Sequence, residues 1–87
     1  MPSVHLHYWA GAKAAAGTAE ETVEAPSVRR ALEIASAARA DGRFDRVLSA
    51  CSLLVDGLAA HEADLDRPLD GPVWVEVLPP FAGGASR

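Results

Sequence analysis

The sequence predicts an α+β roll, in which a mixed sheet of four to five strands packs on one main helix. Three observations predict it. Apolar and polar residues alternate with a period of two over residues 4–9 and 73–78, as they do in half-buried strands. One clear amphipathic helix lies between these segments, and it can cover one face of one sheet. The pair Asp56-Gly57 is a strong signal for a β-hairpin.

The first strand is expected over residues 4–9, and its two faces carry Val4, Leu6 and Tyr8, and His5, His7 and Trp9. Residues 10–16 are rich in alanine and favour a short helical turn that stops at Gly17. Residues 20–25 are acidic and partly alternating. They predict an edge strand, because charges deter further strand pairing.

The main helix is expected to begin after Ser27, whose side chain can cap it, and to end at Gly42. Its apolar stripe consists of Val28, Ala31, Leu32, Ala35 and Ala38. Residues 44–50 predict a short second helix or turn that carries Phe44, Val47 and Leu48 inward.

The second half of the chain predicts three strands. Residues 51–55 read as a buried strand, and the turn at Asp56-Gly57 leads into a short strand over 58–61. Residues 65–69 are expected to form a connecting loop and 70–72 a turn. The last strand carries Val73, Val75 and Val77 on one face and Trp74, Glu76 and Leu78 on the other.

The order of these elements predicts how the strands are arranged. The first and last strands are the most hydrophobic, so we expect them to lie side by side in the centre of the sheet. A helical crossover between the second and third strands predicts that some strand pairs are parallel.

Length and composition restrict the function. An 87-residue chain forms one small domain that buries only about 60–65% of its unfolded surface, which leaves no room for a large enzymatic cleft beside the core. The net charge of −4, without a run of Lys or Arg, argues against a nucleic-acid or membrane-surface partner. The lone Cys51 is expected to be a small buried side chain. No segment has the pattern of a membrane span or signal peptide, which predicts a cytoplasmic protein.

The end of the chain predicts a flexible tail over residues 79–87, after a compact domain over residues 1–78. Pro79 and Pro80 fix φ near the polyproline value and favour a semi-rigid arm. The glycine pair Gly83-Gly84 has no side chain to pack and suits a backbone that threads through a narrow channel. From Pro79 to Gly84 the extended reach is about 20 Å, enough to carry a carboxylate into a partner's active site.

Together these motifs resemble the ubiquitin-like β-grasp sulfur carriers of molybdopterin, thiamine and cysteine biosynthesis, most closely the small subunit of molybdopterin synthase. The resemblance runs nearly end to end, and the tail is its most specific part. The matching segments are the aromatic-ended first strand with residues 10–17, the acidic second strand, Pro26-Ser27-Val28, Leu54-Val55-Asp56-Gly57, and Leu78-Pro79-Pro80-Phe81-Ala82-Gly83-Gly84.

The resemblance implies a function for the tail. An adenylating enzyme of the kind that activates ubiquitin would use ATP to adenylate the carboxylate of Gly84, and sulfur transfer would convert it to a thiocarboxylate. The large subunit of molybdopterin synthase would accept the tail and pass the sulfur to a pterin precursor. The carrier itself would bind no cofactor and supply no acid, base or metal, so it would not be an enzyme alone.

A docking surface is expected on the sheet face opposite the helix. Trp9 and Leu78 would form a partly exposed apolar patch at the root of the tail. The resemblance implies that this face contacts the activating enzyme and the large subunit. The expected partner interface consists of Trp9, Leu78, Ala59, Trp74 and His7. Alternatively, the two tryptophans cap the edge of the core. His5 and His7 lack a third ligand at metal-binding spacing, so we expect no metal site.

Two features depart from the carriers. Ala85-Ser86-Arg87 follow Gly84, so the chain as written has no glycine carboxylate to activate. Either a processing protease removes the three residues, or they are not native to the chain, or the chain is not a sulfur donor. Trp74 also stands in a turn region that is more often acidic in these carriers. One alternative is a carrier for thiamine or cysteine biosynthesis. The other is a protein modifier or interaction module, whose Gly84 forms an isopeptide bond with lysine or whose tail is never activated.

Overall fold

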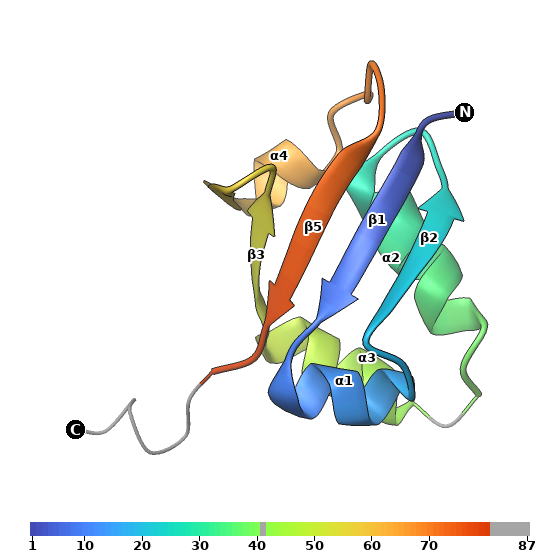
Figure 1. Cartoon of the computed structure of the whole chain (residues 1–87), viewed down its shortest axis with the longest axis vertical. Coiled ribbons are helices and arrows are strands. Elements are labelled where there is room, and N and C mark those ends of the chain that lie inside the picture. The colour runs from blue at the N-terminus through green and yellow to red at the C-terminus, as the bar shows by residue number, and fades with distance from the viewer. Residues whose placement is uncertain (41, 81–87) are drawn as a thin grey trace.

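The computed structural model of the chain describes residues 1–40 and 42–80. Its strands form one five-stranded sheet in the order β2-β1-β5-β3-β4, and helices cover one face of it (Figure 1). The elements are β1 (Ser3–Tyr8), α1 (Ala10–Ala16), β2 (Glu20–Glu24), α2 (Val28–Ala37), α3 (Arg43–Ala50), β3 (Ser52–Val55), β4 (Leu58–Ala60), α4 (Glu62–Leu65) and β5 (Val73–Leu78). None of the helices in this described part is long and apolar enough to cross a membrane.

The α+β prediction is confirmed, including the central position of the first and last strands. β1 and β5 pair in parallel from Val4 beside Val73 to Tyr8 beside Val77. The acidic strand β2 forms one edge of the sheet, as its charges predicted. The parallel pair is β1 with β5, whereas β2 and β3, which flank the helical crossover, are not neighbours in the sheet.

The core lies between one face of the sheet and α2. Alternate residues of the two central strands point into it, and each is less than a tenth exposed: Val4, Leu6, Tyr8, Val73, Val75 and Val77. The helices α2 and α3 contribute Val28, Ala31, Leu32, Ala35 and Phe44 to it. Ser27 caps α2 as predicted, because its Oγ accepts a hydrogen bond from the Arg30 amide at 3.1 Å.

The end of the main helix was predicted wrongly. α2 ends at Ala37, so Ala38 is exposed instead of continuing the buried stripe. Gly42 does not stop α2 but immediately precedes α3, where its φ of 72° lies in the left-handed region that favours glycine. The prediction of a second helix over residues 44–50 is confirmed, with Phe44 buried.

The region after α3 also differs in detail. Cys51 ends α3 and is half-buried instead of buried. Its Sγ donates to the Val47 carbonyl oxygen at 3.2 Å, and burial raises the pKa of the thiol. Strand β3 is half-buried instead of buried, and its first residue, Ser52, is exposed. The short α4 was not predicted, since four residues are too few to show helical periodicity, although its Leu65 is buried.

The predicted hairpin is confirmed and is attached to the central strand. Val55 pairs with Leu58, so Asp56 and Gly57 form a two-residue turn with φ values of 50° and 84°. The Asp56 amide donates to the Trp74 carbonyl oxygen at 2.8 Å, and Asp56 Oδ1 accepts from the Trp74 amide at 2.9 Å. These two bonds fix the start of β5 against the hairpin.

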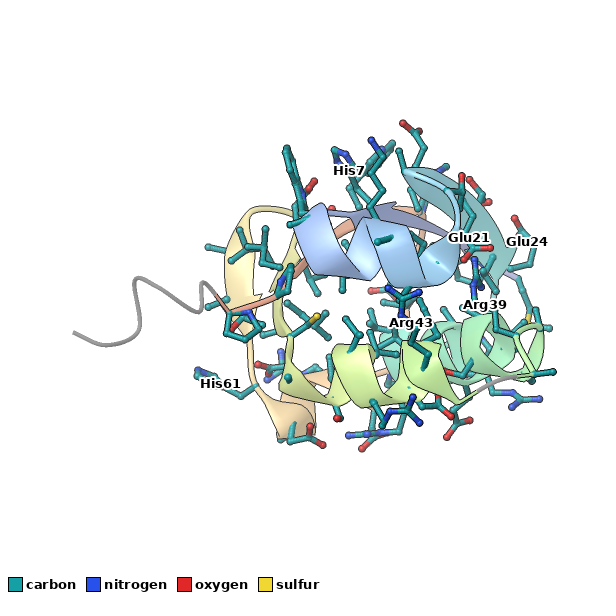
Figure 2. All side chains as sticks on the ribbon, turned by 90° about the horizontal axis from the view of Figure 1, so that it is seen from below. His7, Glu21, Glu24, Arg39, Arg43 and His61 are labelled. Carbon is teal, nitrogen blue, oxygen red and sulfur yellow. The ribbon has the colours of Figure 1, made fainter. Side chains whose placement is uncertain are left out.

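A polar cluster joins the first strand to the edge strand and the helices. The Tyr8 hydroxyl donates to Glu21 Oε2 at 2.5 Å, and an Arg39 guanidinium nitrogen lies 2.9 Å from the same oxygen. Arg39 also donates to the carbonyl oxygens of Ala16, at 3.1 Å, and Ala35, at 2.8 Å. Figure 2 shows Arg39 and Glu21 together beside α1. The cluster holds α1 against the end of the sheet.

The only tyrosine of the chain gives a test of this cluster. Burial, and then its hydrogen bond to Glu21, raise the pKa of Tyr8 well above the usual value of about 10. Stability that depends on this shift is therefore complete below the unfolded pKa and is lost as the pH rises from there toward the folded value. In an alkaline titration we expect tyrosinate absorbance to appear only together with unfolding. A folded chain whose tyrosine ionises near pH 10, as in urea, would contradict the burial of Tyr8.

Candidate functional site

The sheet face opposite the helices carries the predicted interface residues. In Figure 1 this face is turned toward the reader, and α2 lies behind the sheet. The strand register places His5 beside Trp74 and His7 beside Glu76. Across β3 and β4 the same face continues through Leu54. We call this surface the open face and define it by His5, His7, Trp9, Leu54, Ala59, Trp74, Glu76 and Leu78.

Two pairs of aromatic rings stand on the open face. The His5 ring stacks on Trp74 with the ring centroids 4.6 Å apart, and the His7 ring lies 4.4 Å from that of Trp9. The indoles of Trp9 and Trp74 belong to residues that are 45% and 55% exposed, and neither residue is part of the buried core. Exposed aromatic rings that are held by neighbours supply large contact areas at low entropic cost, which is typical of protein interfaces.

Glu76 orients the ring of Trp9. Its Oε1 accepts a hydrogen bond from Trp9 Nε1 at 2.6 Å and lies 3.0 Å from His7 Nδ1. Trp9 directly follows β1, and this carboxylate and the His7 ring both contact its indole. Sequence analysis did not assign this role to Glu76. The alternation of the last strand does place Glu76 on the same face as Trp74. The pairing of Glu76 with Trp9, however, follows only from the parallel register of β1 and β5.

The open face reaches the point where the tail begins. The Trp9 amide donates to the Val77 carbonyl oxygen at 3.2 Å, which continues the register of β1 and β5 and places Trp9 beside Leu78. Leu78 and Pro79 are half-buried and Pro80 is exposed. The structure therefore brings together the apolar pair that was predicted at the tail root. The role of this pair in binding a partner stays a prediction.

Ala59 and Trp74 lie farther from the tail root. Ala59 is exposed on β4 and is connected to β5 through Leu54, which is half-buried. Trp74 lies four residues before Leu78 on the same strand, a separation of about 13 Å. The tail residues Phe81, Ala82, Gly83 and Gly84, which the sequence assigns to channel passage and adenylation, lie outside the described residues.

The described residues contain no group of three or more His, Cys, Asp and Glu side chains that is placed to hold a metal ion. His5 and His7 are instead engaged by Thr22, with Nδ1 to Oγ1 at 3.0 Å, and by Glu76. One surface hollow, of about 530 Å³, lies between α2, α3 and β3. Another, of about 500 Å³, lies at the β3-β4 hairpin, and its lining includes Ala59 of the open face. The open face thus offers apolar area bordered by imidazoles and a carboxylate, a composition suited to binding another protein.

Comparisons with known proteins give the fold. No family model and no curated protein matches the sequence. Among solved structures, small archaeal modifier protein 1 from Methanosarcina acetivorans is similar with a TM-score of 0.79 and 21% identity, covering 97% of this chain and 98% of that one.

Two further matches have names related to molybdopterin. A putative molybdopterin converting factor, subunit 1, from Pyrococcus furiosus has a TM-score of 0.69 and 22% identity, covering 93% of this chain and 100% of that one. A chain from the complex of subunits 1 and 2 of molybdopterin-converting factor from Helicobacter pylori has a TM-score of 0.63 and 15% identity, covering 91% and 95%. The chain therefore has the ubiquitin-like β-grasp fold that these three solved structures share.

Proposed function

We propose that the chain is a sulfur carrier for molybdopterin biosynthesis and acts as the small subunit of molybdopterin synthase. Its Gly84 carboxylate is adenylated by an activating enzyme, converted to a thiocarboxylate, and delivered to the large subunit. The observation that carries the proposal is the exposed Trp9 beside Leu78 at the start of a Pro-Pro-Phe-Ala-Gly-Gly tail. The names of two structural neighbours, both from molybdopterin-converting factor, favour this pathway.

The chemistry assigned to the tail needs little from the carrier. A carboxylate is a poor acyl donor, so it must become a mixed anhydride with AMP before sulfur can replace oxygen. Glycine lets the backbone pass through a tight channel, and the channel excludes the water that would hydrolyse the adenylate. The carrier contributes the docking surface that holds the tail in register with the partner's active site.

The open face serves both partners in turn. Binding of the activating enzyme and of the large subunit to one surface makes the two complexes mutually exclusive, so the carrier must be released once it is charged. The Helicobacter pylori neighbour comes from a complex of subunits 1 and 2, which supports a large subunit as partner. Because activation uses ATP, the proposal also places the protein in the cytoplasm.

Processing is part of the proposal. Ala85, Ser86 and Arg87 follow Gly84, so a protease must remove them before adenylation. The pathway is tested with the chain ending at Gly84, charged as a thiocarboxylate. We expect it to yield molybdopterin from the pterin precursor when the large synthase subunit is added. Sulfur transfer only to a thiamine or cysteine precursor would exclude the molybdopterin pathway and favour the other carriers.

A second function is supported by one finding, the similarity to small archaeal modifier protein 1. In a protein modifier, the activated Gly84 carboxyl forms an isopeptide bond with a lysine of another protein instead of accepting sulfur. The two functions differ in the product that follows adenylation. A thiocarboxylate indicates a carrier, and a covalent conjugate indicates a modifier.

A further inference from the structure

Along the described strands, the side of the sheet that faces away from the helices carries carboxylates but no lysine or arginine. Strand pairing sets Glu20 beside His7 and Glu24 beside Ser3, so both carboxylates lie on the same side of the sheet as Glu76. Within residues 1–40 and 42–80, every lysine and arginine lies on a helix or in the loop that follows one: Lys13, Arg29, Arg30, Arg39, Arg43, Arg46 and Arg67. A protein that docks on this side of the sheet is therefore complementary in charge if its own surface is basic.

A small hollow lies on this side of the sheet, over β2, β1 and β5, and has a volume of about 100 Å³. The strand register explains its walls, because residues paired across neighbouring strands point to the same side of the sheet. Two rows cross the three strands: Thr22, His5 and Trp74 form one, and Glu20, His7 and Glu76 form the next. We call this the β2 hollow and define it by these six residues. It has room for about three waters or for one side-chain head group, but not for a segment of chain.

One part of the β2 hollow is aromatic and is held in place. The His5 ring stacks on Trp74 at a centroid distance of 4.6 Å, and His5 Nδ1 lies 3.0 Å from Thr22 Oγ1. Trp74 is 55% exposed and lies outside the buried core. An exposed indole attracts a cation, and a planar guanidinium can also stack on it. The hollow therefore favours a flat cationic group.

Glu20 is the carboxylate of the β2 hollow that is left to bind such a group. Glu76 Oε1 already accepts from Trp9 Nε1 at 2.6 Å and lies 3.0 Å from His7 Nδ1. Glu20 is exposed, and its side chain has no hydrogen bond or ion pair with the described residues. Its carbonyl oxygen accepts from Thr18 Oγ1 at 3.1 Å, a contact that involves only the backbone of Glu20. No contact within the described chain therefore uses the charge of Glu20.

We propose that the β2 hollow binds an arginine side chain of the activating enzyme when that protein docks on the open face. The inference rests on the proposed function, which supplies this partner. The guanidinium pairs with the Glu20 carboxylate and lies against the Trp74 side of the hollow. Arginine fits better than lysine, because its planar head both stacks on rings and donates two parallel hydrogen bonds to a carboxylate. The hollow is continuous with the open face, since His7 and Trp74 belong to both.

The charge of Glu20 can also protect the edge of the sheet. Charged side chains on an edge strand deter pairing with another chain, and β2 is an edge strand. This protection does not depend on the sign of the charge. Glu20→Arg therefore keeps the protection and reverses only the interaction with a basic partner, whereas Glu20→Gln removes the charge at nearly constant shape.

Calorimetric titration of the activating enzyme with the chain ending at Gly84, without ATP, measures the effect on docking. We expect Glu20→Gln to raise Kd about fivefold at low salt, and Glu20→Arg to raise it further through repulsion. The Debye length falls from about 10 Å at 0.1 M salt to about 3 Å at 1 M, so both effects should shrink at 1 M. The effect of Trp9→Ala, which removes apolar contact, should persist. Glu33 is exposed on α2, behind the sheet, and Glu33→Gln should leave Kd unchanged.

Two competitors separate arginine from lysine. N-acetylargininamide and N-acetyllysinamide carry the same charge, so at equal ionic strength they screen the complex equally. The arginine compound should weaken the wild-type complex more than the lysine compound does, and this difference should shrink with Glu20→Gln. Equal competition by the two compounds would overturn the assignment of an arginine.

Failure of the inference and failure of the proposed function give different results. If the wild-type chain binds the enzyme and Glu20→Arg alters neither Kd nor its salt dependence, the inference is wrong and the proposed function stands. If the wild-type chain does not bind the activating enzyme, the proposed function is contradicted, and the inference with it. Sedimentation of the chain alone tests a second copy as the occupant. Self-association that Glu20→Arg abolishes would overturn the assignment to the enzyme.

Discussion

Replacing Trp9 with alanine is expected to weaken binding to the activating enzyme by about 2 kcal/mol, roughly a thirtyfold rise in Kd. Trp9 lies beside Leu78 at the tail root, is 45% exposed, and donates a hydrogen bond from its indole to Glu76. Truncation removes apolar contact area between the open face and the partner. It also weakens the contact that positions the tail in the partner's active site. Isothermal titration calorimetry with the chain ending at Gly84 measures the change in Kd.

Three variants serve as controls for Trp9→Ala. Glu76→Gln keeps an acceptor for the indole and should bind nearly as wild type, whereas Glu76→Leu frees the ring and should bind more weakly. Leu58→Ala removes an apolar residue that is 75% exposed but whose register partner, Val55, lies on the helix side of the sheet. It should leave Kd unchanged. Unaltered affinity of a folded Trp9→Ala chain would show that the open face is not the docking surface.

Replacing Phe44 with alanine is expected to lower the free energy of unfolding by about 3–5 kcal/mol. Phe44 is 2% exposed, and its ring meets that of Tyr8 edge to face at a centroid distance of 5.5 Å. The Arg39 guanidinium lies 4.6 Å from the centroid of the Phe44 ring. Truncation leaves a cavity and removes both ring contacts. Small domains have only about 5–15 kcal/mol of stability, so this loss is a large share of the total.

Urea denaturation with and without the substitution measures this loss. Phe44→Leu keeps most of the buried volume and should cost less than Phe44→Ala. Trp74→Ala is a matched substitution of an aromatic residue that is 55% exposed, and it should cost no more than about 1 kcal/mol. Equal stability losses for Phe44→Ala and Trp74→Ala would mean that α3 does not pack on the core as described.

The sheet could be predicted from the sequence because apolar and polar residues alternate regularly in its two central strands. In β1 and β5 every second residue is buried, so a period of two identified both strands and the face that each presents. The prediction of the helix end failed because a glycine is compatible with more than one position relative to a helix. Gly42 suits the end of one helix as well as the residue before the next, and only the exposed Ala38 shows that α2 has already ended.

Part of the candidate site could be predicted because it depends only on which strands are neighbours. Placing the first and last strands side by side was enough to bring Trp9 near Leu78, and the structure has them adjacent. The link from Trp9 to Glu76 required the register itself, since a shift of one residue would turn Glu76 to the other face. The predictions for Phe81, Ala82, Gly83 and Gly84 concern residues outside the described part of the chain and stay predictions.

The central claim is that Gly84 carries sulfur, and the intact mass of the protein tests it most directly. The full chain and the chain ending at Gly84 are each incubated with activating enzyme, ATP and a sulfur source, with a chain ending at Gly83 as control. The account predicts that only the chain ending at Gly84 gains the mass difference between one sulfur and one oxygen. An unchanged mass of this chain, with an enzyme shown to charge another carrier, would contradict the account.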